Sequence, residues 1–196
     1  MRTFADICKK MKSKRSIFFL SFCCLLSLFA VAQEDKKVKV GASSMYSSRN
    51  ISDNLLQSKD NAILFEALES AKLLDSLKSK GPFTIFAPTD DAFNKLPEGT
   101  VNTLLKQENS KTLKIILTYH IIPSYVSTYD ILRAIKKGKG EIPLKTMAGK
   151  YLIASLDGKK IILTDEIGGK LSIAIGNIKQ LNGVIHIVDT VALPKF

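Results

Sequence analysis

The chain contains only three cysteines among its 196 residues. All three, Cys8, Cys23 and Cys24, lie near the N-terminus, and the sequence after Cys24 has none. That long stretch therefore offers no thiol nucleophile, no disulfide and no cysteine-based metal site. Because no covalent cross-link is available, a domain built from it depends on its hydrophobic core for stability, and its length is sufficient to form one.

Histidine is equally scarce, with only His120 and His186. A metal site built on them would need carboxylate ligands at short spacing, and the sequence shows no such pattern. There is no Gly-x-Ser-x-Gly nucleophile motif, and no helix is expected after Gly168-Gly169 to complete a phosphate-binding loop. The adjacent acids Asp90 and Asp91 are explained by their place at a helix start. The sequence therefore predicts that the protein is not an enzyme and uses no metal or cofactor.

The N-terminal segment has the pattern of an export signal. A basic region, residues 2–15, precedes an apolar stretch from Ile17 to Ala30, and Ala30-Val31-Ala32 matches a small-x-small cleavage sequence. We therefore predict a signal peptide over residues 1–32, with an uncleaved leader retained as a membrane anchor as the alternative. The expected location is secreted or in the cell envelope, in the periplasm or at the cell surface.

Part of the formal net charge of +11 belongs to this leader, which carries six Lys or Arg and one Asp. Removing the leader leaves +6, with local basic runs at Lys136-Lys137-Gly138-Lys139 and Lys159-Lys160. This moderate basicity suits an extracellular protein or an anionic glycan as partner. Nucleic acid is not expected for an exported protein, membrane contact is expected only through an uncleaved leader, and we predict a monomer.

The central pattern of the sequence is a strand, a turn and a helix. Alternating apolar residues predict a buried strand over Phe83 to Ala87, which Pro88 ends because proline cannot donate to a sheet ladder. Thr89 is the expected N-cap of the next helix. A second cap is predicted farther along, where Ser127 and Asp130 have the spacing of a capping box.

The chain is predicted to contain a polar N-terminal arm, residues 33–48, and one folded domain, residues 49–196. Helical spacing dominates the first part of this domain, with caps expected at Asn50 and Asp60. From Glu141 onward the apolar period changes to two, and Asp-Gly and Asn-Gly pairs indicate tight hairpins. Helices followed by an antiparallel meander, which the strand at 83–87 must join, indicate the α+β class. The strands expected after Glu141 span residues 142–147, 151–156, 160–164, 171–175 and 184–188.

Three sequence signatures resemble those of the fasciclin domain family. They are Thr84-Ile85-Phe86-Ala87-Pro88-Thr89-Asp90-Asp91-Ala92-Phe93, then Tyr119-His120-Ile121-Ile122-Pro123, then Asn182-Gly183-Val184-Ile185-His186-Ile187-Val188-Asp189. The resemblance spans roughly residues 40–194. It implies a wedge of two small β-sheets with helices packed along one side. The signature residues expected to serve this structure are Phe86, Pro88, Thr89, Phe93, Asn182, Gly183, His186 and Asp189.

The resemblance also implies a binding or adhesion module that contacts matrix, glycan or a surface protein. The Tyr-His region of animal members has been linked to receptor binding, which makes Tyr119, His120 and Pro123 the candidate partner-binding residues here. Adhesive animal domains tend to carry an Asp-Ile pair before the third signature, and this chain has Asn177-Ile178 instead. A bacterial envelope or secreted protein is therefore favoured over an integrin ligand.

The two histidines receive different expectations. His186 alternates with Val184 and Val188, which predicts a buried, hydrogen-bonded imidazole that joins sheet to helix. Tyr119 and His120 are neighbours on a predicted short strand, residues 119–122, so one of them is expected to be buried and the other near the surface. The alternative function is a haem or lipid carrier in which His120 lies at the rim of an apolar groove.

Overall fold

A parallel pair of strands, β3 (Phe83–Pro88) and β9 (Gly183–Val188), joins the early and late parts of the chain. The computed structural model describes residues 35–138 and 140–196, and the predicted signal peptide, residues 1–32, lies outside the described residues. One sheet has the strand order β4-β3-β9-β8-β7-β6-β5, and β1 and β2 form a second sheet. Apart from β3–β9, the pairings in these sheets are antiparallel.

The other strands are β1 (Lys37–Val40), β2 (Ser43–Tyr46), β4 (Ile121–Ile122), β5 (Glu141–Lys145), β6 (Tyr151–Asp157), β7 (Lys160–Thr164) and β8 (Lys170–Gln180). The helices are α2 (Ile51–Leu56), α3 (Ala62–Ser70), α4 (Leu74–Lys78), α5 (Asp90–Asn94), α6 (Thr100–Leu104), α7 (Ser110–Tyr119) and α8 (Thr128–Lys137), with a 3-10 turn η1 (Gln107–Asn109). Most of the strands predicted from the period of two are thus present within one or two residues of their expected bounds.

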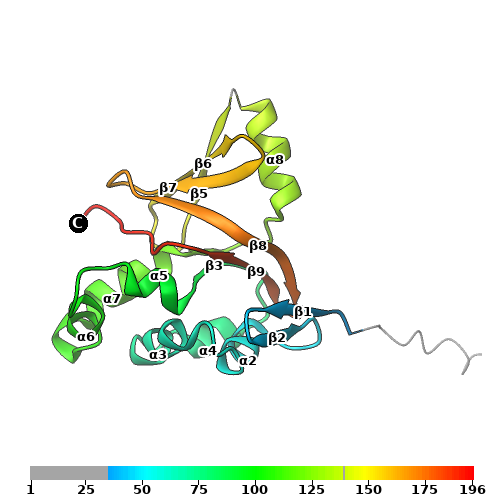
Figure 1. Cartoon of the computed structure of the whole chain (residues 1–196). Helices are drawn as coiled ribbons and strands as arrows, with labels where there is room; N and C mark the ends of the chain where they lie inside the picture. Colours follow the sequence, from blue (N-terminus) through cyan, green and yellow to red (C-terminus); the bar gives the residue numbers. More distant parts are fainter. Residues whose placement is uncertain (1–34, 139) are drawn as a thin grey trace, which may run out of the picture. The chain divides into compact units, whose positions relative to one another are not determined.

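Strand β8 is longer than its expected range because it takes part in two sections of the large sheet. Its first residues, 170–172, pair with β7, and the part from Ile173 to Gln180 pairs with β9. Register shifts on either side of Ile175 make the pairing of β8 with β9 irregular. Figure 1 shows β5–β7 diverging from β3 and β9, with α8 beside them and α2–α7 below. The α+β class and the fasciclin-like arrangement of sheets and helices are confirmed.

Strand β3 separates two hydrophobic cores. Ile85 and Ala87 point into the helix-side core, which they share with α2–α7, whereas Phe86 points into the wedge core, which lies between α8 and strands β6–β8. Strand β9 divides in the same way, because Ile185 and Ile187 belong to the helix-side core and Val188 to the wedge core. Both faces of this strand pair are therefore buried, which explains why apolar residues occur on both sides of β3 and β9.

Three of the expected helix caps are present. Asn50 accepts from the Asp53 N–H, Thr89 accepts from the Ala92 N–H, and Ser127 forms both bonds of the capping box with Asp130. The expected cap at Asp60 is wrong, because its carboxylate accepts the Ala42 N–H instead. Asp90, from the start of another helix, accepts the Ile63 N–H at 2.9 Å in the first turn of α3.

The described part of the predicted polar arm is folded and packs on the domain. Residues 37–46 form the β1–β2 hairpin, and Met45 and Val40 are buried in the helix-side core. The Asn54 side chain bonds both the N–H and the C=O of Tyr46, which fixes the hairpin on α2. Composition alone did not reveal this element because its few apolar residues alternate with serine and lysine.

Candidate binding surface at the loop before α8

The loop that joins β4 to α8 presents polar and aromatic groups to solvent on a firmly held backbone. Pro123, Ser124 and Tyr125 are exposed, and Val126 is half-buried. The Thr84 hydroxyl, from β3, donates to the Ser124 carbonyl at 2.6 Å and accepts the Val126 N–H at 2.8 Å. A threonine of the first signature thus holds the loop that follows the second signature.

His186 holds the same loop from the other side. Its side chain is fully buried, and Nε2 donates to the Val126 carbonyl at 2.9 Å. Its Nδ1 accepts the Asn177 N–H at 3.1 Å, so both ring nitrogens are satisfied in the neutral form. Burial lowers the pKa of His186, because a charged imidazole would lose its hydration there. The ring also stacks on Phe86, with centroids 5.5 Å apart.

Asn177 connects the irregular part of β8 to the first turn of α8. Its backbone is left-handed (φ 61°), a conformation that asparagine adopts more readily than most residues. Its Oδ1 accepts the Thr128 N–H at 2.8 Å, and its Nδ2 donates to the Thr128 hydroxyl. These bonds join the irregular part of β8 to the start of α8, which gives the asparagine of this chain a structural role.

The contacts of Thr84, His186 and Asn177 converge on residues 124–128, although the three residues come from distant parts of the sequence. A loop with this many long-range bonds holds its exposed side chains in a defined place. Such preorganisation lowers the entropic cost of binding a partner. The loop and the helix that follows it are therefore the candidate functional site.

We call the exposed side chains here the α8 surface, which consists of Tyr125, Tyr129, Arg133, Lys136 and Lys137. Tyr129 is 68% exposed and Tyr125 is 45% exposed. The residues of this surface on α8 itself follow the spacing i, i+4, i+7 and i+8, so they line the side opposite the buried Ile131 and Ile135.

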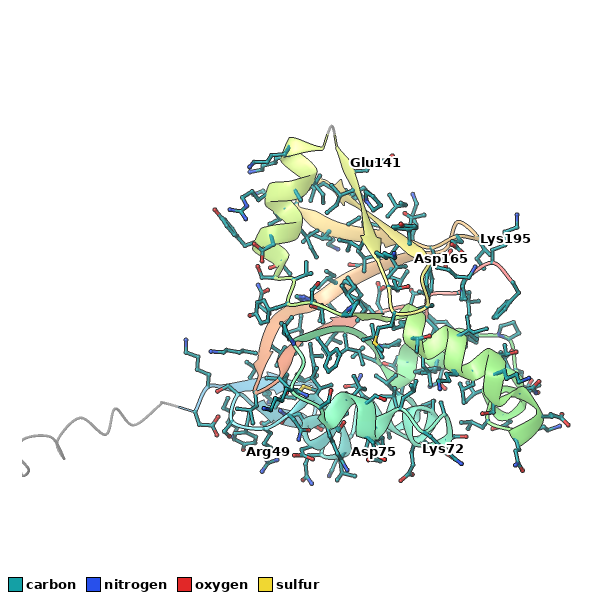
Figure 2. All side chains as sticks on the ribbon, turned by 180° about the vertical axis from the view of Figure 1, so that it is seen from behind. Arg49, Lys72, Asp75, Glu141, Asp165 and Lys195 are labelled. Carbon is teal, nitrogen blue, oxygen red and sulfur yellow. The ribbon has the colours of Figure 1, made fainter. Side chains whose placement is uncertain are left out.

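The α8 surface combines aromatic rings with positive charge. The Arg133 guanidinium lies 5.8 Å from the centroid of the Tyr129 ring. Asp130 forms an exposed ion pair with Arg133 at 3.6 Å, and its acidity is increased mainly by its hydrogen bonds with Ser127, which lower its pKa. Glu141 begins β5 beside the end of α8 (Figure 2). The surface is thus basic with acidic neighbours, rather than uniformly positive.

Tyr119 and His120 differ from their expected placement. They belong to the C-terminal end of α7 and not to a strand, since only Ile121 and Ile122 pair with β3. Both side chains are buried, with exposures of 0% and 1%, so the expectation that one would lie near the surface is wrong. Of the three candidate partner-binding residues, Pro123 alone is exposed.

The buried pair makes specific bonds. The Tyr119 hydroxyl donates to the Tyr151 carbonyl at 2.7 Å and accepts the Glu166 N–H at 3.2 Å, and burial raises the pKa of Tyr119. His120 Nδ1 donates to the Ile116 carbonyl at 2.8 Å, and Nε2 accepts the Ala192 N–H at 2.9 Å. Burial lowers the pKa of His120 to about 4.

These contacts do not suit the carrier hypothesis for His120. An iron ligand needs a free lone pair on Nε2, and here that lone pair accepts the backbone N–H of Ala192. The side chain is also not at the rim of a groove, because it is buried between α7 and the C-terminal segment. Haem or lipid binding through His120 would therefore require this part of the fold to open.

The remaining signature residues serve the scaffold. Asn182 accepts the Ile51 N–H and donates to the carbonyls of Leu77 and Ser79, so it joins α2 and α4 to β9. Gly183 lies so close to the Phe83 carbonyl that a Cβ would collide with it. Phe86, Pro88, Thr89, Phe93 and Asp189 lie along β3, α5 and the end of β9, and Asp189 accepts the Ser172 N–H at 2.7 Å.

Asp165 has a structural role that the sequence did not indicate. It is 7% exposed, and its carboxylate accepts the N–H groups of Ile167, Gly169 and Leu193. Figure 2 shows it near Lys195, at the end of the molecule where the C-terminal segment runs. Asp165 thus organises a loop and fixes this segment, which in turn supplies the Ala192 N–H to His120.

Among residues 35–138 and 140–196, no group of three or more His, Cys, Asp or Glu side chains is placed to hold a metal ion. Within the same residues, no helix is long and apolar enough to cross a membrane. The sequence signatures do not include the exposed residues Tyr125, Tyr129 and Arg133, which follow the second signature. The helical spacing of Tyr129 and Arg133 opposite Ile131 and Ile135 was a signal that could have revealed them.

Comparison with known proteins gives the family. The fasciclin domain model matches residues 59–194. The chain belongs to the fasciclin domain family. Protein sll1483 of Synechocystis is 33% identical over 160 residues, which are 82% of each chain. Immunogenic protein MPB70 of Mycobacterium bovis is 29% identical over 122 residues, 62% of this chain and 54% of that protein.

Longer fasciclin-domain proteins match over one part of their length. Transforming growth factor-beta-induced protein ig-h3 of the pig is 32% identical over 133 residues, which are 68% of this chain and 17% of that protein. A solved FAS1 domain pair from the insect cell adhesion molecule fasciclin I superposes with a TM-score of 0.65 at 17% identity. The match covers 73% of this chain and half of the pair, so the likeness shows the fold of a single fasciclin domain.

Proposed function

We propose that the protein is an extracellular or cell-envelope binding module that contacts an anionic glycan through its α8 surface and performs no catalysis. The observation that carries this proposal is the pairing of exposed tyrosines and cations with a loop that Thr84 and His186 hold in place. The relationship to the cell adhesion molecule fasciclin I and the predicted export signal support the cellular setting.

The chemistry of the α8 surface favours this partner. Tyrosine offers a flat apolar face with a polar tip, which suits the mixed surface of a sugar ring. Arg133 can bind a carboxylate or sulfate through two parallel N–H donors, and Lys136 and Lys137 add charge on the same helix side. Tyr119 and His120 are buried and stabilise the fold. The residues proposed to contact the glycan are the exposed Tyr125 and Tyr129 instead.

The test is binding of the purified protein to heparin and to polygalacturonate, measured by titration calorimetry, with neutral dextran as the control polymer. Replacing Tyr129→Ala together with Arg133→Ala is expected to weaken binding by about fivefold or more, because an aromatic anchor and a cation are lost. Raising the salt concentration is expected to weaken binding of the unaltered protein.

A matched control removes one exposed tyrosine and one exposed lysine elsewhere. Tyr151→Ala with Lys78→Ala changes residues on β6 and α4, outside the α8 surface, and is expected to leave binding unchanged. Equal binding by both double variants, or equal binding to dextran, would contradict the proposal. Capture of an extracellular protein that depends on Tyr129 and Arg133, without glycan binding, would assign the surface to a protein partner instead.

A further inference from the structure

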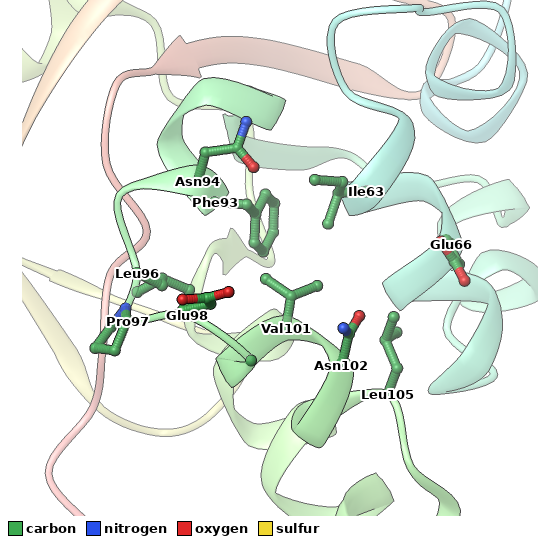
Figure 3. A pocket seen from close by; sticks show the side chains of 11 residues that line it. Ile63, Glu66, Phe93, Asn94, Leu96, Pro97, Glu98, Val101, Asn102 and Leu105 are labelled. Atoms are coloured by element: carbon green, nitrogen blue, oxygen red, sulfur yellow. The ribbon is translucent and has the colours of Figure 1, made fainter.

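A concave site, separate from the α8 surface, lies among α3, α5 and α6. It has a volume of about 500 Å³. Figure 3 shows Ile63, Phe93 and Val101 facing one another across it, with Leu105 farther along the same wall. The helix α6 that forms one wall has no buried residue, so it borders this groove without closing over it.

The charge of the groove is opposite to that of the chain. The chain has 29 Lys and Arg against 18 Asp and Glu, yet the residues lining the groove include Glu66 and Glu98 and no Lys or Arg. Figure 3 shows these two glutamates at opposite ends, with the apolar residues between them. Neither carboxylate forms an ion pair with another residue that the structure describes.

Two carboxamides complete the lining. Asn94 and Asn102 are exposed at the edge of the groove, and each side chain offers both a donor and an acceptor. Such groups match the alternating N–H and C=O groups of an extended peptide. The groove thus has a carboxylate at each end and an apolar floor between them, with carboxamides along its edge.

From this arrangement we propose that the groove binds an extended peptide segment in which apolar residues are flanked on both sides by lysine or arginine. The apolar side chains would cover Phe93 and Val101, and the two cations would pair with Glu66 and Glu98. Both carboxylates are exposed, so each pairing is a surface ion pair that selects for positive charge and weakens as the salt concentration rises. This site is separate from the α8 surface and does not depend on the glycan proposal.

The experiment uses fluorescence polarisation of the purified protein with a labelled, end-capped peptide, Lys-Leu-Val-Leu-Lys. Two comparison peptides test each part of the pattern: Glu-Leu-Val-Leu-Glu reverses the charge, and Lys-Ser-Gly-Ser-Lys removes the apolar middle. The first peptide is expected to bind at least tenfold more tightly than either comparison peptide.

Glu66→Gln with Glu98→Gln is expected to weaken binding by about tenfold, because both charges are lost while the shape is kept. The control, Glu69→Gln with Glu108→Gln, removes two exposed acids of α3 and η1 outside the groove and is expected to bind as the unaltered protein does. Val101→Lys places a like charge on the floor and is expected to abolish binding, with the melting temperature reporting that the fold is kept.

Three results would overturn the proposal. The first is binding of the acidic or the polar peptide as tightly as that of Lys-Leu-Val-Leu-Lys. The second is unchanged binding by the Glu66→Gln, Glu98→Gln protein. The third is self-association in analytical ultracentrifugation that is lost in the same variant, which would make a second copy of this chain the occupant.

Discussion

The regions around His120 and His186 use the same residue in opposite ways. His120 donates from Nδ1 and accepts at Nε2, whereas His186 donates from Nε2 and accepts at Nδ1. Each imidazole has two hydrogen-bond partners, and all four partners are backbone groups. Each neutral ring therefore joins two chain segments. The comparison teaches that a buried histidine of this family member acts as a backbone clamp, and the tautomer follows from which nitrogen faces a carbonyl.

The two clamps differ in what they support. His120 joins α7 to the C-terminal segment at Ala192, and Asp165 fixes that segment from the other side at Leu193. His186 joins the irregular part of β8 to the loop that presents Tyr125. A change at His120 should therefore affect stability alone, whereas a change at His186 should affect stability and the α8 surface together.

The largest expected effect is that of acid on both clamps. In the folded protein the pKa of His120 is about 4, and burial also lowers the pKa of His186, so the unfolded chain binds more protons below its ordinary histidine pKa of 6.5. Their stabilising contribution is complete above pH 6.5 and is lost as the pH falls toward 4. For His120 the loss in the free energy of unfolding is about 2 kcal/mol at pH 5 and about 3 kcal/mol at pH 4.

Urea unfolding at several pH values measures this loss, and the interval from pH 7 to 5 isolates the histidines. The carboxyl groups with lowered pKa, such as Asp130 and Glu166, begin to lose their contribution only at lower pH. If a histidine ring resonance titrates near pH 6.5 in the folded protein, that imidazole is not buried and does not make its two backbone hydrogen bonds.

The second prediction distinguishes the roles of His120 and His186 by mutating each one separately. His120→Ala and His186→Ala should each lower the free energy of unfolding by about 3 kcal/mol, because each leaves a cavity and two buried backbone groups without partners. Urea unfolding checks the stability of each variant. At a temperature where both remain folded, heparin binding should weaken for His186→Ala and stay unchanged for His120→Ala. Equal binding losses in the two variants would remove the distinction between the regions.

A smaller effect is expected from removing the hydroxyl of Thr84, which holds the loop before α8. Thr84→Val keeps the size of the buried side chain but removes the bonds to Ser124 and Val126, and it should cost about 1–2 kcal/mol in the free energy of unfolding. Heparin binding should weaken as well, since the loop loses one of the three side chains that hold it, with His186 and Asn177 remaining. Hydrogen exchange at the Val126 amide measures the loosening directly, and unchanged protection there would contradict the anchoring role of Thr84.

The smallest expected effect concerns the region of His120. Tyr119→Phe removes the bonds to Tyr151 and Glu166 while keeping the buried ring, so the free energy of unfolding should fall by about 1 kcal/mol. Heparin binding should remain that of the unaltered protein. A loss of heparin binding in this variant would mean that the Tyr-His signature contributes to the contact in a way that the buried geometry does not explain.

Local patterns predicted much of this fold because their causes lie within a few residues. The alternation over residues 83–87, the cap at Thr89 and the capping box at Ser127 depend on neighbours along the chain. The hairpin of residues 37–46 was not predicted, since its apolar side chains are few and become buried only against the domain. The strand expected from residue 119 begins only at Ile121, because Tyr119 and His120 complete the last turn of α7, where the His120 N–H donates to the Leu117 carbonyl.

The sequence by itself determined most of the strands, most of the caps and the family, because these follow from residue type at short spacing. Only the tertiary structure decided which side chains meet. It placed Thr84, Asn177 and His186 around one loop, buried both Tyr119 and His120, and set Glu66 and Glu98 at the two ends of a groove. The physical reason is that burial and long-range hydrogen bonds depend on how distant segments pack, which no local spacing encodes.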